Sequence, residues 1–276
     1  MSAAGPFLDV RPEAAFEAGH RPGAASVPLE ELARRIHELP PRDEAIAVFD
    51  EDGDRARAAV LALRARGYGR AVVAGPEAGA SGAGAVETGP SRARLWRPTP
   101  LVEDALPRVV AALGGPGRAL DLGMGTGRNA VFVALSGFTV EGIDILPDAC
   151  ERALDLARRH GVAGRLRARV LDLARAPASQ AVAVSAFDLI VVVGLLERPL
   201  LPAIRAGVRP GGFVLYETFL EEQRRRFGKP RSEARLLAPG ELRAAFEGFA
   251  VEIYREGLAA PRRFVASLLA RRPPVA

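Results

Sequence analysis

Residues 118–130 read R-A-L-D-L-G-M-G-T-G-R-N-A. Apolar residues bracket an acid at 119–122, the pattern of a short buried parallel strand. Three glycines follow at alternate positions, and residues 129–135 can start a helix. Because glycine has no Cβ, a ligand can lie directly against the chain in such a turn. A strand, a glycine turn and a helix N-terminus form the ligand crevice of a doubly wound α/β sheet, and we expect this fold class here.

The spacing of the glycines excludes two common ligands. The dinucleotide fingerprint G-x-G-x-x-G would place its third glycine at Arg128, so the match fails. A phosphate-binding loop needs Gly-Lys-Ser/Thr, whereas Gly127 is followed by Arg128 and Asn129. By itself the turn could also belong to some other α/β protein.

Two more acids follow predicted strands in order. Residues 140–143 read as the next strand, and Asp144 stands at its carboxyl end, 23 positions after Asp121. A carboxylate there can accept hydrogen bonds from both hydroxyls of a ribose. Asp172 follows a third strand-like run, residues 169–171. One glycine-rich turn is weak evidence, whereas three such landmarks in this order are strong evidence.

The acid-x-G-x-G-x-G run, the two later acids and the R-P-G-G turn at 209–212 resemble class I S-adenosylmethionine-dependent methyltransferases. The resemblance implies a Rossmann-like domain with a seven-stranded, mostly parallel sheet and an antiparallel edge strand, and S-adenosylmethionine as the cofactor. It assigns Asp144 to the ribose, Asp172 to the adenine amino group and Asp121 to the methionine end. The full set of implied cofactor-binding residues is Asp121, Gly123, Gly125, Gly127, Asn129, Asp144, Ile145, Asp172, Leu173 and Val193.

The acceptor is indicated by a narrower resemblance. G-M-G-T-G-R-N-A is similar to the tellurite-resistance-type and thiopurine-type methyltransferases, which act on small soft nucleophiles such as thiols, selenite or tellurite. Glu217 is our candidate for orienting or deprotonating the substrate. Thr218, Arg231 and Trp96 are candidate substrate contacts, although Trp96 could equally be a packing residue.

A basic segment follows the fifth predicted strand of this domain. Residues 224–235 carry six basic side chains and one acid. They could clamp an anionic substrate, because arginine forks match oxyanions and carboxylates. They could instead form a solvated hairpin, or grip a phosphate backbone, for which interleaved aromatic residues are lacking beyond Phe227.

The N-terminal region has its own resemblance. L-D-V-R-P at 8–12, G-H-R-P-G-A at 19–24 and R-A-R-G-Y-G-R-A-V-V-A-G-P at 64–76 resemble a rhodanese-like α/β domain. Rhodaneses place a cysteine nucleophile after the central strand, where this chain has Asp50, and the loop 50–55 carries four carboxylates. Without a thiolate no persulfide can form, so we expect a non-catalytic module. It could stabilise or dock, or its acidic loop could receive a cation or a basic partner.

These patterns divide the chain into three parts. Residues 1–75 form the rhodanese-like domain, 76–94 a flexible Gly/Ala-rich linker, and 95–276 the methyltransferase domain. Within the first domain, residues 29–39 are amphipathic and predict a helix.

Composition sets outer limits on function. A single cysteine excludes an intramolecular disulfide and a cysteine-built metal site, and we expect no metal. No apolar run approaches the length of a membrane span and no secretory signal is apparent, so we expect a cytoplasmic protein without a membrane partner. The net charge of +5 comes almost wholly from arginine and does not by itself indicate a nucleic-acid partner.

Three function classes remain open. The first is a methyltransferase for a small-molecule acceptor, with the first domain for docking or regulation. The second is an RNA or protein methyltransferase whose first domain docks the substrate. The third is a non-enzymatic sensor that binds S-adenosylmethionine. The sequence leaves the acceptor, the oligomeric state and the protein partner of the first domain undetermined.

Overall fold

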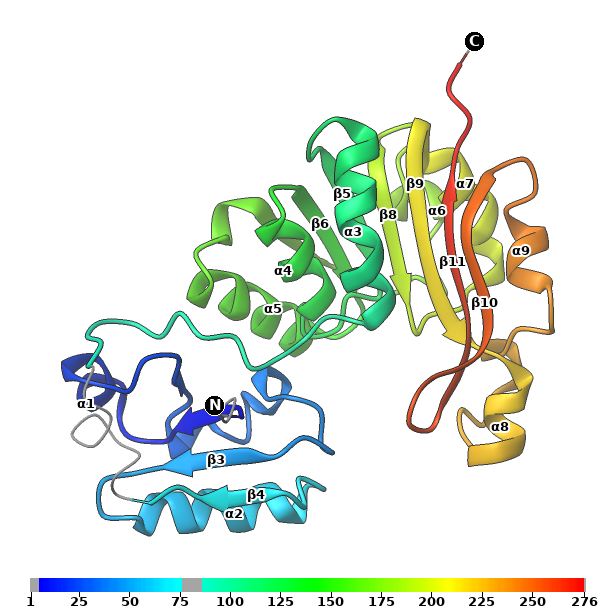
Figure 1. Ribbon diagram of the computed structural model, residues 1–276. Coiled ribbons are helices and arrows are strands. Elements are labelled where there is room, and N and C mark those ends of the chain that lie inside the picture. The colour runs from blue at the N-terminus through cyan, green and yellow to red at the C-terminus, as the bar shows by residue number, and fades with distance from the viewer. Residues whose placement is uncertain (1–4, 76–85, 276) are drawn as a thin grey trace. The chain divides into compact units, whose positions relative to one another are not determined.

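The computed structural model describes residues 5–75 and 86–275 (Figure 1). The chain divides into two compact units, Met1–Arg97 and Pro98–Ala276. Each unit is an α/β fold with one sheet. None of the helices in the described ranges has the length and apolarity needed to cross a membrane.

The first unit is built on a four-stranded parallel sheet in the order β2-β1-β3-β4. Its central strands are short and buried because one side packs on helices and turns from the same unit. Its elements are β1 (Phe7–Asp9), α1 (Glu13–Ala18), β2 (Ala25–Ser26), η1 (Leu29–Glu31), η2 (Ile36–Glu38), β3 (Ile46–Phe49), α2 (Asp54–Ala65) and β4 (Ala71–Val73).

The helix predicted over residues 29–39 is wrong. The structure forms two short 3-10 turns, η1 and η2, in its place. Prolines at 28 and 40 fix the backbone at both ends of this segment. Between the two turns, the Arg35 guanidinium bonds the Ser26 carbonyl at 3.0 Å and the Glu38 carboxylate at 2.8 Å, which holds the bend. Leu32 and Leu39 are nevertheless in the core, with Leu29 and Ile36 partly buried against it.

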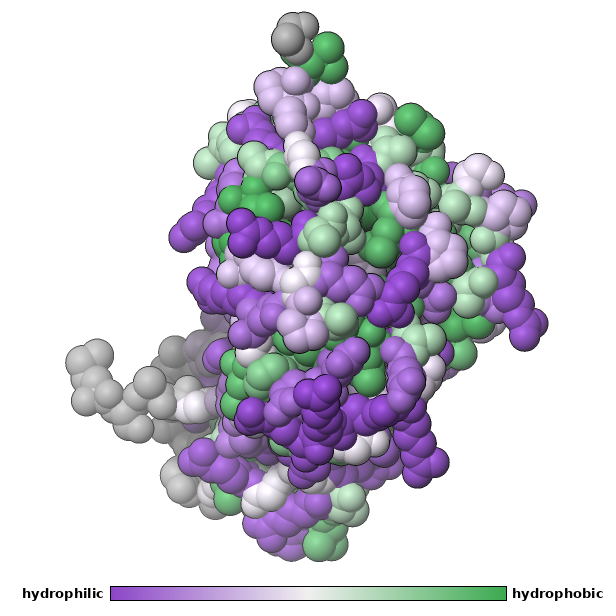
Figure 2. Space-filling view, turned by 90° about the vertical axis from the view of Figure 1, so that its right-hand side faces the viewer, coloured by the Kyte–Doolittle hydropathy of each residue, from purple (hydrophilic) through white to green (hydrophobic). Residues whose placement is uncertain are grey.

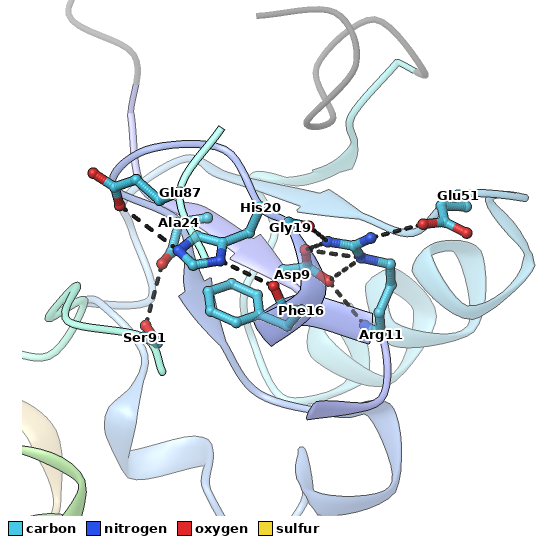
Figure 3. Close-up of polar contacts among 9 residues, drawn as sticks. All are labelled: Asp9, Arg11, Phe16, Gly19, His20, Ala24, Glu51, Glu87 and Ser91. Carbon is cyan, nitrogen blue, oxygen red and sulfur yellow. Dashed lines mark hydrogen bonds and ion pairs between the residues drawn. The ribbon is translucent and has the colours of Figure 1, made fainter. Parts of the chain in front are cut away.

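The chain after residue 85 lies on the first unit. His20 and Glu87 exchange two backbone hydrogen bonds of 2.9 Å, and the Ser91 hydroxyl donates to the Ala24 carbonyl at 3.2 Å (Figure 3). The His20 ring stacks on Phe16 with centroids 3.7 Å apart. Residues 76–85 of the predicted linker lie outside the described residues, and residues 86–94 belong to the first unit by these contacts.

The second unit is a seven-stranded sheet in the order β10-β11-β9-β8-β5-β6-β7. Its strands are β5 (Arg118–Leu122), β6 (Thr139–Asp144), β7 (Leu166–Val170), β8 (Phe187–Val193), β9 (Val208–Phe219), β10 (Ala250–Ala260) and β11 (Arg263–Arg271). Its α-helices are α3 (Pro100–Leu113), α4 (Arg128–Leu135), α5 (Pro147–Arg159), α6 (Ala178–Ala181), α7 (Leu201–Gly207), α8 (Glu221–Phe227) and α9 (Glu241–Ala245), with short 3-10 turns η4 (Ala163–Arg165), η5 (Arg198–Leu200) and η6 (Glu233–Arg235).

Helices cover both faces of this sheet. In Figure 1, α3 crosses in front of the central strands, while α6 and α7 lie behind them. The rear face carries the large core cluster, in which Leu120, Ile190 and Tyr216 from three strands pack with Ile204 of α7 and Phe246 beside α9. Two-sided cover explains why β8 is buried along nearly its whole length.

Strands β5 to β9 are parallel, and β11 runs antiparallel between β9 and the edge strand β10. The two strands predicted to close the sheet, at 251–254 and 264–269, are the hairpin β10–β11. The predicted fold class is confirmed for both units.

Candidate functional site

The carboxyl ends of five parallel strands lie side by side at one edge of the second sheet. Along the sheet β5 is flanked by β6 on one side and β8 on the other. The chain therefore leaves β5 and β8 toward opposite sides, and this switch point is where open α/β sheets bind ligands. The loops after β5 and β8 meet there: a Cβ on Gly123 would lie 3.3 Å from the Leu195 side chain.

The glycine turn after β5 is fixed by backbone bonds to β6. The amides of Gly123 and Met124 both donate to the Ile143 carbonyl, at 2.8 and 3.0 Å. Gly123, Gly125 and Gly127 have φ values of 72°, 55° and 83°, a left-handed conformation that favours glycine. The predicted strand, glycine turn and helix are thus all present as β5, the turn and α4. The turn between them is held by its hydrogen bonds to Ile143.

The glycines of this loop serve different purposes. At Gly127 a Cβ would lie 2.5 Å from the Cβ of Ala153 and 2.9 Å from its Cα, so this glycine lets α4 and α5 pack. At Gly125 a Cβ would meet nothing within 4 Å. The backbone at Gly125 therefore borders open space and can be approached by a ligand.

Asp144 stands at the end of β6 and organises the same loop. Its carboxylate accepts hydrogen bonds from the Gly125 amide at 2.8 Å and the Leu146 amide at 3.0 Å. Each oxygen of a carboxylate can accept more than one hydrogen bond, so both retain capacity for hydroxyl donors. Ile145 and Leu146, directly beyond it, are 53% and 58% exposed and present apolar surface at the same edge.

Asp121 on β5 is the buried acid of the site. It is 2% exposed, and among the described residues its Oδ2 has no hydrogen-bond partner. Burial, with a smaller contribution from the nearby charge of Asp144, raises its pKa to about 7, against a lowering hydrogen bond from the Ala130 backbone. Two carboxylates near one another, one of them buried and under-bonded, favour a cationic ligand.

This raised pKa makes a testable contribution to stability. An acid whose pKa is higher in the folded than in the unfolded chain stabilises the fold when protonated, and that stability is lost as pH rises from about 4 through about 7. Asparagine at position 121 cannot ionise. We therefore expect Asp121→Asn, in the full chain without ligand, to raise the free energy of unfolding of the second unit at pH 8 by up to roughly 4 kcal/mol. Urea unfolding at pH 8 and pH 4 measures the difference, which should disappear at the lower pH. An equal difference at both pH values would contradict this account.

The geometry fits the methionine and ribose ends of S-adenosylmethionine. The under-bonded carboxylate of Asp121 would receive its ammonium group, Asp144 would accept its ribose hydroxyls, and the bare backbone at Gly125 leaves room for the chain between them.

Other residues predicted for the cofactor lie at the same edge with separate structural roles. The Asn129 side-chain carbonyl accepts the Thr99 amide at 2.8 Å, which joins the start of α4 to the start of α3. Asp172 accepts the Ala174 amide at 3.0 Å, and Leu173 beside it is buried. Val193 ends β8 and is partly exposed. Their contacts with a cofactor remain predictions.

Glu217 is buried and already paired. It is 2% exposed, its Oε1 accepts from the Arg263 guanidinium at 3.0 Å, and its Oε2 accepts from the Ser267 hydroxyl at 2.9 Å. Strand register places Glu217 on the same sheet face as Asp121, since Asp121, Val191 and Leu215 are aligned and side chains alternate along a strand. This arrangement favours an orienting role over proton removal.

The other candidate substrate residues are spread over different places. Thr218 is buried on the opposite sheet face from Glu217, because it is the next residue along β9 and pairs with Ala266 of the rear core. Arg231 is exposed beyond α8. Trp96 is buried and belongs to the first unit, with the Arg94 guanidinium 5.0 Å from its ring centroid. Within the second unit, the structure therefore does not place Thr218 on the same sheet face as Glu217.

Much of the basic segment is neutralised by its own neighbours. Arg224 pairs with Glu233, Arg225 with Glu221 and Glu222, and Arg226 with Glu222; the N–O distances are 2.6 to 3.5 Å. Because these arginines are paired with Glu233 and with the acids of α8, the structure favours a solvated, internally paired helix over an anion clamp.

Sequence reasoning missed several residues that shape the site. Ser267 and Arg263 hold Glu217, and the buried Tyr216 hydroxyl donates to the Leu195 carbonyl at 3.1 Å, which fixes the loop after β8. Ser267 and Arg263 are about fifty positions from Glu217 in the chain. Their role follows from the antiparallel β9–β11 register, for which the sequence carries no signal.

In the first unit, the loop after β3 holds Asp50. Its carboxylate accepts the Arg55 amide at 3.1 Å and is 9% exposed. Arg11 nearby pairs with the buried Asp9 at 2.8 Å and with Glu51 of the loop at 2.7 Å (Figure 3). The Asp50 carboxylate thus occupies one backbone N–H donor of the loop, that of Arg55. The Arg11 guanidinium compensates the charge of Glu51.

Comparison with known proteins agrees with this geometry. Residues 1–75 match the rhodanese-like domain family, and residues 93–248 match a methyltransferase domain family. An uncharacterised protein of Schizosaccharomyces pombe is 22% identical over 86% of this chain and 83% of its own length. The ribosomal protein L11 methyltransferase of Syntrophotalea carbinolica is 34% identical, over 45% of this chain and 39% of that protein.

Some solved structures have partial similarity to this chain at low identity. TehB from Haemophilus influenzae is 19% identical, with 62% of this chain and 61% of that one covered at a TM-score of 0.49. The methyltransferase family match spans more than half of the chain. The chain therefore belongs to the methyltransferase domain family: it is an S-adenosylmethionine-dependent methyltransferase with a rhodanese-like domain ahead of its methyltransferase domain.

Proposed function

We propose that this chain methylates a small soft acceptor of the thiol or selenite/tellurite type. The observation that carries the donor half of the proposal is the pair of carboxylates, Asp121 and Asp144, on either side of the open backbone at Gly125. The acceptor half is supported by the resemblance of the glycine loop to enzymes for such nucleophiles. It is also supported by the state of Glu217, our candidate base, because both of its carboxylate oxygens are already engaged.

S-adenosylmethionine supplies an activated methyl group, so the task of the protein is alignment. Holding two reactants in line can supply roughly 7–11 kcal/mol of a barrier. Asp121, Asp144 and the glycine loop would fix the donor, and the loop after β8, held by Tyr216, would close its other side. A soft nucleophile ionises readily or needs no deprotonation. This suits a site in which the buried Glu217 carboxylate is held in an ion pair with Arg263.

We propose that the first unit docks or regulates and does not transfer sulfur. Asp50 replaces the nucleophile, and its carboxylate bonds the Arg55 amide, which would otherwise face an anionic sulfur donor. The negative charge of Asp52 adds to the repulsion of an anion.

A protein substrate is the second candidate. The 34% identity with a ribosomal protein L11 methyltransferase favours it, although the match covers less than half of either chain. In this case the first unit would bind the protein substrate.

The test combines a binding and a turnover measurement on the full chain. Calorimetric titration with S-adenosylhomocysteine should show one site, and label from S-adenosylmethionine should pass to thiophenol or selenite more readily than to a bulk ribosomal protein fraction. Transfer to the protein fraction alone would replace the first candidate by the second. Binding without transfer to any of them would indicate a sensor, and no binding would refute the proposed function itself.

A further inference from the structure

A groove lies on the α3 face of the sheet, which is also the face of Asp121. It has a volume of about 570 Å³, within the roughly 300–1,000 Å³ usual for small-molecule sites. Its floor is Glu217, Val265 and Ser267, and its walls are α3 and the edge strand β10. All of these residues belong to the second unit.

Strand register connects this groove to the donor edge. Val193 of β8, Glu217 of β9, Ser267 of β11 and Arg255 of β10 are direct cross-strand neighbours and form one row across the same face. Neighbouring strands are about 4.8 Å apart, so Arg255 lies roughly 10 Å from Glu217 along the row. An elongated acceptor lying in the row would have one end beside Val193 and Glu217 and the other at Arg255.

The inner end of the row offers hydrogen-bond acceptors and no free cation. The carboxylate of Glu217 is compensated by Arg263, and its remaining lone pairs can accept from a ligand. An oxyanion placed here would face a carboxylate with no unpaired positive charge. A neutral group with an O–H, N–H or S–H bond can donate to it.

The outer end carries unpaired positive charge. In the part of the chain that the structure describes, no ion pair or hydrogen bond engages the side chains of Arg255 on β10, or Arg108 and Asp104 on α3. Glu256 is turned to the other sheet face, where it accepts from the Gly240 amide at 2.7 Å. The groove lining holds two acids at this end, Asp104 and Glu256, and Glu256 is already bonded. The two arginine forks can hold a single carboxylate. Figure 2 views the side of the molecule where β10 lies, and hydrophilic residues cover most of it.

On the basis of the proposed function, we infer that the acceptor is an organic acid: an apolar body with a hydrogen-donating nucleophile at Glu217 and a carboxylate at Arg255 and Arg108. Leu101 and Ile253 supply apolar contacts along the groove. A three-oxygen ion such as selenite would fill little of this volume and would leave both arginines unused. The basic segment around Arg231 plays no part in this recognition.

Rigid two-ring probes test both ends of the groove on the full chain saturated with S-adenosylhomocysteine. By calorimetry, 6-hydroxy-2-naphthoate should bind at least tenfold more tightly than 2-naphthol, which lacks the carboxylate, and than 2-naphthoate, which lacks the donor. Selenite should not compete with it. Arg255→Ala and Arg108→Ala should each weaken the hydroxynaphthoate about tenfold and leave 2-naphthol unchanged, while the matched control Arg231→Ala has no effect.

The outcomes separate the two levels of the argument. Normal S-adenosylhomocysteine binding with no preference for the hydroxynaphthoate, effective competition by selenite, or a loss caused by Arg231→Ala alone would overturn the inference and leave the donor site intact. Failure of S-adenosylhomocysteine itself to bind would refute the proposed function, and this inference with it.

Discussion

Asp144→Ala is expected to weaken S-adenosylhomocysteine binding by about 100-fold or more. Hydrogen bonds to a charged group are each worth roughly 1.5–3 kcal/mol, and the ribose can make two to this carboxylate. The same substitution removes the acceptor for the Gly125 amide, so the loop that borders the ligand also loses its anchor. Calorimetry on the full chain measures the dissociation constant.

The matched control for this result is Asp148→Ala. Asp148 lies four positions later on α5, and its side chain is exposed and paired only with Arg152 at 2.6 Å. Its loss should leave the dissociation constant within about twofold, because exposed pairs contribute little. A dissociation constant that is unchanged in Asp144→Ala, or equally raised in both variants, would refute the ribose assignment.

Two alanine substitutions in the glycine loop should differ in their main effect: one should weaken ligand binding and the other should lower stability. Gly125 and Gly127 both have positive φ, so each alanine costs roughly 1–2 kcal/mol of backbone strain. Gly127→Ala adds an overlap with the Ala153 backbone, and overpacking of this kind costs about 1–3 kcal/mol more. Gly125→Ala adds no overlap in the protein, but its methyl group occupies the space that a ligand would fill.

We therefore expect Gly125→Ala to lose only the strain of about 1–2 kcal/mol in unfolding free energy and to bind S-adenosylhomocysteine at least tenfold more weakly. Gly127→Ala should unfold at clearly lower denaturant, with a loss of about 2–5 kcal/mol. Urea unfolding and calorimetry on the same preparations distinguish them. Each variant serves as the control for the other, and equal stability losses with equal binding losses would contradict the separate roles.

The donor half of the site could be predicted from sequence because it is local. Asp121, the three glycines and Asp144 lie within 24 residues, on one strand–turn–helix–strand unit whose geometry is set by apolar patterning and by glycine. The pKa of Asp121 could not be predicted, since it depends on how completely α4 and the sheet exclude water from one carboxyl group.

The acceptor half depends on contacts between distant segments. Glu217 looked like a free acid at the end of a strand, but the β9–β11 register brings Ser267 and Arg263 onto it. Likewise Glu217 and Thr218 are adjacent in the chain and appeared to form one site, whereas strand alternation turns them to opposite faces. In the first unit, the amphipathic pattern at 29–39 predicted the burial of Leu32 but not the backbone, which the flanking prolines and Arg35 decide.

The most direct measurement is the crystal structure of the full chain grown with S-adenosylhomocysteine. The account predicts density for the ligand against the Gly125 backbone, with both ribose hydroxyls within hydrogen-bond distance of Asp144 and the amino group within that distance of Asp121. Ligand density at another edge of the sheet, or a ribose directed away from Asp144, would contradict it.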